Sequence, residues 1–209
     1  MRLAQAARHL AQGSGAIIEI ALDVGYDSPQ AFARAFRDFT GVSPSGYQGR
    51  HGRIAAAATT DLVEVAPVDV LCLRHNGPIE SIGLTYRKLF ALLAGRADLS
   101  LSSPQIGVST GDPAGGDFIY HAGVAAAPLT VPIAGVGLLR LEGGLYASHR
   151  LIGPYALITP TFQALFGKWL PQSGFEPADR PALEFYRTSS ELGERSDSVT
   201  DLMIPVREI

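Results

Sequence analysis

Apolar and polar positions over residues 2–40 recur with the period of α-helices. The pattern predicts a first helix over Arg2–Gln12, with its apolar face at Leu3, Ala6, Ala7 and Leu10. It predicts a second helix, ended by Gly25, with its apolar face at Ile17, Ile18, Ala21, Leu22 and Val24. Each helix needs a neighbour against which this face is buried.

A third helix follows closely, and capping residues mark its start. Ser28 is a good N-cap, and Pro29 suits the first helical position because it has no N–H to leave unpaired. The apolar stripe of this helix consists of Phe32, Phe36 and Phe39. We expect the second helix to pack against this stripe through Ile18, Ala21 and Leu22.

Residues 49–60, "GRHGRIAAAATT", have small side chains and no clear period, which is typical of a linker. From Asp61 onward the pattern changes to short strands with single helices between them. We therefore expect a helical piece at 1–48, a linker at 49–60 and a larger domain at 61–209.

The larger domain repeats itself. Strands, a helix and two more strands occur twice, and an offset of 76 residues pairs Gly77-Pro78 with Gly153-Pro154 and Tyr86 with Phe162. An offset of 77 then pairs Ile106 with Leu183. The predicted fold class is α+β, with two copies of a strand–helix–strand–strand unit and a ligand cleft at the seam between them.

Composition describes an ordinary globular protein: 46% of the 209 residues are apolar and 18% are charged. No signal peptide or membrane span is evident, which predicts a cytoplasmic protein. The single cysteine, Cys72, lies in an apolar strand-like run and is interpreted as a small core residue. Residues 1–53 hold six Arg and four acidic residues, so +2, while the rest of the chain carries −5. The two parts are therefore expected to have different partners.

The second and third helices form a candidate DNA-reading unit. Such a unit needs a rigidly held helix that exposes polar groups from its first turns and carries cations for phosphates. Gln30 and Arg34 project from those turns, and they suit adenine and guanine edges respectively. On periodicity alone, an αα-hairpin of another helical module stays open as an alternative.

The stretch "IIEIALDVGYDSPQAFARAFRDFTGVSPSGYQ" closely resembles the second helix-turn-helix of AraC/XylS-family transcription regulators. The resemblance rests on the "IA…VGY" turn, the "S…F…F" helix and the closing "G.SP..Y". It implies that the helix Ser28–Thr40 enters the major groove, with contacts from Ser28, Pro29, Gln30, Ala33, Arg34 and Arg37. The family carries two such units, so this sequence is expected either to start downstream of the true start or to have lost one.

A carboxylate in "RPALEFYRT" is the second candidate site. Strand alternation puts Leu183 and Phe185 on one face, which we expect to pack on a helix, and puts Glu184 and Tyr186 on the other. From the pattern alone, Glu184 is either a cleft residue or a plain solvent-facing glutamate.

Residues 61–209 resemble the GyrI-like effector-binding domain through "RHNGPI", "RLIGPY", "FGKWLPQSGFEP" and "RPALEFY". The resemblance implies a central pocket in which Glu184 pairs with cationic, aromatic ligands. The aromatic residues expected near it are Tyr155, Trp169, Tyr186 and Tyr86. A carboxylate among aromatic rings combines charge pairing with cation–π attraction. Trp169 and Tyr86 fit the core equally well.

The sequence therefore predicts a ligand-responsive transcription regulator whose partners are double-stranded DNA and a small amphipathic or cationic molecule. A homodimer is compatible with this class. The three histidines near strands lack metal-ligand spacing, so we expect neither metal nor cofactor. Two alternatives stay open: a sequestering protein with a vestigial helix-turn-helix, and a hydrolase of strained cyclopropane toxins that uses Glu184.

Overall fold

A computed structural model describes residues 2–12, 15–40, 43–49, 60–95, 103–111, 117–126, 133–187 and 198–209. Most of the predicted linker at 49–60 lies outside these ranges. The chain divides into two compact units, one containing the first helices and 151–174, the other containing 60–150, 175–191 and 199–209. No helix of the described residues is long and apolar enough to cross a membrane.

The three N-terminal helices are confirmed: α1 is Arg2–Gln12, α2 is Ile17–Asp23 and α3 is Pro29–Thr40. A further helical segment follows at 44–49. A chain of ring contacts links the turn after α2, α3 and this segment through Tyr26, Phe32, Phe36 and Tyr47, with centroids 5.5, 5.3 and 5.2 Å apart. Because Phe32, Phe36 and Tyr47 are fully buried, these contacts fix α3 against its neighbours.

The expected packing of α2 through Ile18 and Leu22 is wrong. Both side chains are 58% exposed, whereas Ile20, Ala21 and Val24 are buried. The buried residues 20, 21 and 24 lie on one helical face, and residues 18 and 22 lie on another. Apolar residues on almost every position of this short helix left the choice of face undetermined.

Among the described residues, one sheet of nine strands forms the larger domain. Its strands are β1 (Thr60–Val65), β2 (Val68–Arg74), β3 (Gln105–Thr110), β4 (Ile119–Ala126), β5 (Gly137–Leu141), β6 (Gly144–Ile152), β7 (Phe175–Pro177), β8 (Ala182–Tyr186) and β9 (Val199–Glu208). The short strand β7 pairs with β9 and was not expected from the sequence.

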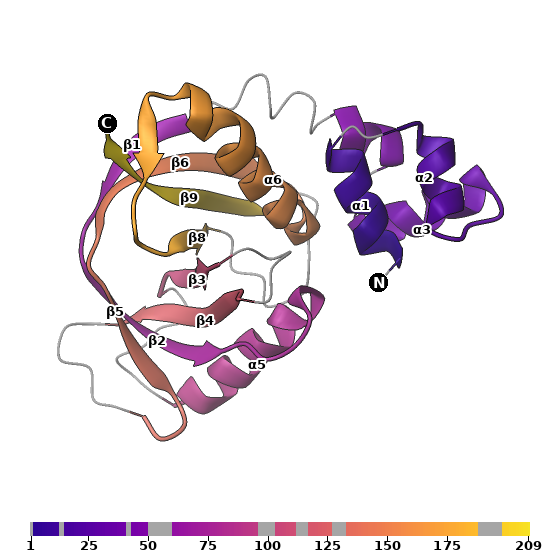
Figure 1. Ribbon diagram of the computed structural model, residues 1–209. Helices are drawn as coiled ribbons and strands as arrows, with labels where there is room; N and C mark the ends of the chain where they lie inside the picture. Colours follow the sequence, from indigo (N-terminus) through magenta and orange to yellow (C-terminus); the bar gives the residue numbers. More distant parts are fainter. Residues whose placement is uncertain are drawn as a thin grey trace. The chain divides into compact units, whose positions relative to one another are not determined.

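The order of strands across the sheet is β1-β6-β9-β8-β3-β4-β2-β5, which Figure 1 shows from β1 at the top to β5 at the bottom. The repeat makes β1, β2, β3 and β4 the counterparts of β5, β6, β8 and β9. Replacing each strand by its counterpart gives the same strand order read from the other edge of the sheet. The two halves are therefore related by a two-fold axis between the central strands β3 and β8.

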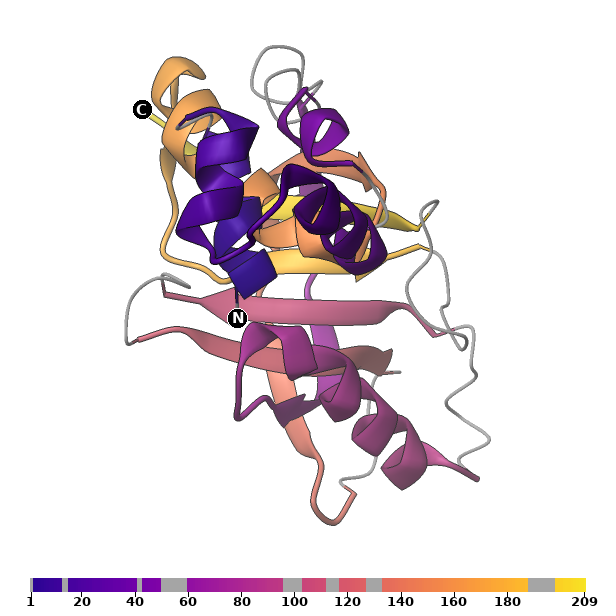
Figure 2. The same ribbon diagram turned by 90° about the vertical axis from the view of Figure 1, so that its right-hand side faces the viewer.

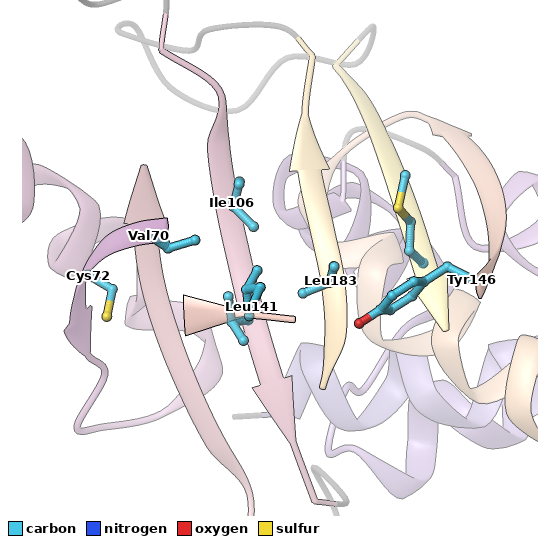
Figure 3. Packing of buried hydrophobic residues seen from close by; sticks show 8 residues of the cluster. Val70, Cys72, Ile106, Leu141, Tyr146 and Leu183 are labelled. Atoms are coloured by element: carbon cyan, nitrogen blue, oxygen red, sulfur yellow. The ribbon is translucent and has the colours of Figure 1, made fainter. Parts of the chain in front are cut away.

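One face of this sheet is covered by its own strands. Its buried cluster consists of Val70, Cys72, Ile106, Val108, Leu141, Tyr146, Leu183 and Met203, all from strands. Figure 3 shows these side chains projecting from several neighbouring strands into a common core. Leu183 and Phe185 thus pack against strands, and the expectation that they pack on a helix is wrong. Residues of the outer strands β2, β5 and β6 meet those of the central strands, so the sheet itself encloses this core.

The opposite face of the first half carries a helix. A single turn at Ile79–Ser81 leads into α5 (Ile82–Leu93), which packs against β2 and β4 (Figure 2). Its buried contacts to the sheet join Leu89 and Leu93 to Leu71 and Val124. In the second half the equivalent run is helical but changes pitch: a turn at Tyr155–Leu157, α6 (Ile158–Ala164), a wide π turn at Leu165–Trp169 and a tight turn at Leu170–Gln172.

Candidate ligand site and nucleic-acid interface

Glu184 lies at the centre of the sheet, next to the two-fold axis. It is on β8 directly opposite Gly107 of β3, and these two positions are counterparts in the repeat. As the alternation predicted, its side chain is on the face opposite Leu183. Only 6% of Glu184 is exposed. The alternative of a plain solvent-facing glutamate is therefore excluded.

Two tyrosine hydroxyls hold the carboxylate. The Tyr120 hydroxyl donates to Oε2 of Glu184 at 2.9 Å, and the Tyr186 hydroxyl donates to the same oxygen. The two hydroxyl oxygens are 3.1 Å apart. Tyr120 comes from β4, two strands away from Glu184, and the sequence interpretation did not include it. It reaches Glu184 across β3.

Gly107 makes that reach possible. A Cβ at this position would lie 2.2 Å from the Tyr120 hydroxyl oxygen and 2.7 Å from Oε2 of Glu184. Both distances are shorter than any van der Waals contact, so no other residue fits without moving one of the two groups. The absent side chain on β3 therefore provides the space in which the carboxylate and the hydroxyl meet.

Aromatic rings surround this polar centre. Tyr86 of α5 contacts the Tyr186 ring edge-to-face at 5.6 Å and stacks on Phe90 at 6.0 Å. Phe118 lies 6.4 Å from the Tyr120 ring. The predicted members Tyr86 and Tyr186 are thus next to Glu184 or to its hydrogen-bond partner. The helix α5 contributes Tyr86 and Phe90, β8 contributes Tyr186, β4 contributes Tyr120, and Phe118 lies just before β4.

Burial and hydrogen bonding act oppositely on the carboxylate. Burial raises the pKa of Glu184, while the hydrogen bonds from Tyr186 and Tyr120 stabilise the charged form and limit the rise. Burial, together with the nearby Glu184 charge, raises the pKa of Tyr120 and of Tyr186 well above the ordinary tyrosine value. Both tyrosines therefore stay protonated donors, and Glu184 is the titrating group of the cluster.

The other predicted ligand residues, Tyr155 and Trp169, belong to the compact unit that contains the N-terminal helices. Glu184 belongs to the other unit, so their place beside Glu184 stays a prediction. Of the histidines, His75 has a structural role. Its Nε2–H donates to the Pro78 carbonyl at 3.0 Å, and its Nδ1 is hydrogen-bonded to the Thr85 hydroxyl at 2.8 Å. Within the described residues no three of His, Cys, Asp or Glu cluster as potential metal ligands.

A second buried carboxylate, Asp201, has a different environment. Arg150 binds it through two hydrogen bonds of 2.8 and 3.1 Å, and Arg187 adds a third of 2.8 Å. Although burial alone would raise it, these guanidinium groups hold the pKa of Asp201 below its ordinary value. Asp201 is thus already paired with cations, whereas no Lys or Arg of the described chain lies within ion-pair distance of Glu184.

The predicted DNA-reading helix has the required exposure. The Ser28 hydroxyl accepts a hydrogen bond of 3.1 Å from the Ala31 N–H, which confirms the N-cap. Gln30, Arg34 and Arg37 are exposed along one side of α3, at spacings of four and three residues. Pro29 and Ala33 are half-buried between this side and the aromatic core. The arrangement offers an amide and two guanidinium groups on one surface.

The α2–α3 turn is also held from α1. The Arg2 guanidinium donates to the Gly25 carbonyl at 3.0 Å and lies 5.1 Å from the centre of the Tyr26 ring. Gly25 has φ of +79°, a conformation that favours glycine, so it ends α2 as expected. These contacts fix the angle between the two helices of the unit.

An exposed basic helix on a helix-turn-helix, joined to a domain with a buried carboxylate among aromatic rings, defines the class of DNA-binding regulators with a small-molecule domain. The chain belongs to the family of the GyrI-like small molecule binding domain, whose model matches residues 59–207. The model of a helix-turn-helix domain matches residues 1–50. An AraC-type helix-turn-helix and a GyrI-like domain are therefore joined in one transcription regulator.

Solved structures share this fold at low sequence identity. EcmrR in a complex with DNA is 13% identical with a TM-score of 0.62, covering 98% of this chain and 77% of that chain. SAV2435 bound to tetraphenylphosphonium is 17% identical with a TM-score of 0.52, covering 71% of this chain and 93% of that chain. A hydrolase from Listeria innocua is 13% identical with a TM-score of 0.52, covering 77% and 98% respectively.

Proposed function

We propose that this regulator senses a small amphipathic cation, which binds at Glu184 and changes how the helix-turn-helix binds DNA. The cleft expected between the two halves would place the ligand over the central strands. The ligand's charge pairs with the carboxylate, and its apolar part lies against the surrounding rings.

The observation that carries this proposal is a buried carboxylate without a cationic partner among the described residues. Burying a charge is costly unless it is paired, and two neutral hydroxyls replace only part of its hydration. A cationic ligand removes that cost by supplying the missing charge. The contrast with Asp201, which has two arginines, shows what a purely structural carboxylate looks like in the same sheet.

The DNA-binding half of the proposal rests on α3. Gln30 and Arg34 would contact base edges, and Arg37 would contact the phosphate backbone. A single helix-turn-helix makes few phosphate contacts, so binding by one copy is expected to be weak and strongly salt-dependent. Arg37→Ala is expected to weaken binding and to reduce the slope of log K against log salt by about one.

Calorimetric titration with an aromatic cation tests the ligand half. The probe is trimethyl(naphthylmethyl)ammonium or its tertiary-amine analogue, N,N-dimethyl(naphthylmethyl)amine, at pH 7. Glu184→Gln is expected to lower the affinity at least about tenfold, since it removes the opposite charge at a desolvated site. Glu64→Gln is the matched control, because Glu64 is an exposed strand glutamate. If neither probe binds the unmodified chain, the proposed ligand class is wrong.

A mobility-shift assay on the chain's own promoter DNA tests the regulatory half. Binding at low salt that changes when the probe is added supports a ligand-responsive regulator, and absence of binding at low salt contradicts it. Chromatography of each probe after incubation separates sensing from turnover. Recovery of unchanged compound is the expected result, and a product that disappears with Glu184→Gln would assign a hydrolase instead.

A further inference from the structure

The two oxygens of the Glu184 carboxylate have different surroundings. Both tyrosine hydroxyls donate to Oε2, whereas Oε1 accepts no hydrogen bond from the described residues. Oε1 is not among the fully enclosed side-chain atoms that lack a partner, so it keeps some accessible surface. Oε2 therefore has two hydrogen-bond partners within the protein, and Oε1 has none among the described residues.

The protons of the cluster are fully used in the charged state. Each tyrosine has one hydroxyl proton, and the contacts with Oε2 and between the two hydroxyls use both protons. Neither hydroxyl is then available to donate to a ligand, although both can still accept. A ligand group that meets Oε1 must consequently bring its own donor.

Access to Oε1 is narrow. Only 6% of Glu184 is exposed, and the rings of Tyr120, Tyr186 and Tyr86 lie around it. An ammonium N–H can approach a carboxylate oxygen to about 2.8 Å and form a charge-assisted hydrogen bond. A quaternary nitrogen or a phosphonium is covered by carbon substituents, which keep its charge farther away and leave it without a donor.

We propose that this site selects aromatic amines carrying at least one N–H on the protonated nitrogen over quaternary or otherwise shielded cations. The inference rests on the proposed function, since it concerns the same carboxylate, and it names the chemical class of the ligand. The aromatic rings determine which apolar part of a ligand fits, and Oε1 determines which cationic group is preferred.

A matched pair of ligands tests this directly in the unmodified chain. N,N-dimethyl(naphthylmethyl)amine is protonated at pH 7 and has one N–H, and trimethyl(naphthylmethyl)ammonium has a methyl group in its place. Scaffold and charge are the same. Because hydrogen bonds to charged groups are among the stronger ones in proteins, the tertiary amine is expected to bind at least about tenfold more tightly by calorimetry.

The preference must also depend on Glu184. In Glu184→Gln the ratio of the two affinities is expected to fall close to one, and in the Glu64→Gln control it should stay as in the unmodified chain. Equal or tighter binding of the quaternary ligand by the unmodified chain overturns the inference while leaving the proposed function intact. A preference that survives Glu184→Gln also overturns it. If neither ligand binds, the proposed function itself fails.

Discussion

Gly107→Ala introduces the smallest side chain at the point where the site has no room. The backbone tolerates alanine there, since Gly107 lies in a paired strand and is not among the glycines with positive φ. The added Cβ would lie 2.2 Å from the Tyr120 hydroxyl oxygen, 2.9 Å from Tyr120 Cζ and 2.7 Å from Glu184 Oε2. Either the tyrosine or the carboxylate must move.

The expected cost follows from these contacts. Overpacking of a filled interior costs about 1–3 kcal/mol. Displacing the Tyr120 hydroxyl also removes a hydrogen bond to a carboxylate, worth roughly 1.5–3 kcal/mol. Because one movement produces both effects, we expect a loss of about 2–4 kcal/mol in the free energy of unfolding. Ligand affinity should fall with it, since the carboxylate is no longer held.

Urea unfolding followed by circular dichroism measures the loss, and Gly137→Ala is the matched control. Gly137 is also a strand glycine, but its added Cβ would meet the Cys72 carbonyl at an ordinary 3.4 Å. In a Tyr120→Phe background, which lacks the atom at 2.2 Å, Gly107→Ala should cost less. Equal stability of Gly107→Ala and Gly137→Ala would refute the reasoning.

The remaining predictions concern the two buried carboxylates and the helix cap. Glu184→Gln is expected to raise the melting temperature of the ligand-free chain at pH 7 in a thermal-shift assay, because it removes a buried charge. Since burial raises the Glu184 pKa, that gain should shrink as the pH falls and the wild-type carboxyl is protonated. Asp201→Asn should cost roughly 1.5–3 kcal/mol at pH 7 in urea unfolding. The pKa of Asp201 is lower in the folded chain than in the unfolded chain. The stability that its carboxylate contributes is therefore present above the unfolded-state pKa and is lost as the pH falls through the folded-state pKa. The stability difference between the wild type and Asp201→Asn must consequently become smaller in acid. Ser28→Ala should lose about 1 kcal/mol of helix stability by the same method, and an unchanged midpoint would contradict the observed cap.

The N-terminal helices were predictable because their signals are local. Ser28 and Pro29 mark the start of α3 within two residues, and Gly25 marks the end of α2. The face of α2 that becomes buried was not predictable to the same degree. Ile18 and Leu22 are as apolar as the buried residues, and only contacts with other helices decide which face is covered.

The candidate site was predictable on β8 and at Tyr86 of α5, and not on β4. Alternation correctly separated Glu184 from Leu183, because the side-chain period of a strand is fixed. Tyr120 was missed because its contact with Glu184 depends on strand order, with β3 between them. The repeat held a usable signal: the offset of 77 that pairs Ile106 with Leu183 also pairs Gly107 with Glu184. A glycine opposite a glutamate at a two-fold axis indicates space reserved for that glutamate.

The palindromic sheet restricts how such a duplicated domain can evolve a charged site. Positions 107 and 184 face each other across the axis on adjacent strands. A protein assembled from two identical halves would place two carboxylates there, and at that separation one would be forced to keep its proton. Such a pair shares one proton, so its single negative charge has no fixed place on either strand. With glycine at 107 and glutamate at 184, the charge instead belongs to one strand, and the Tyr120 hydroxyl of the other half uses the space that the glycine leaves.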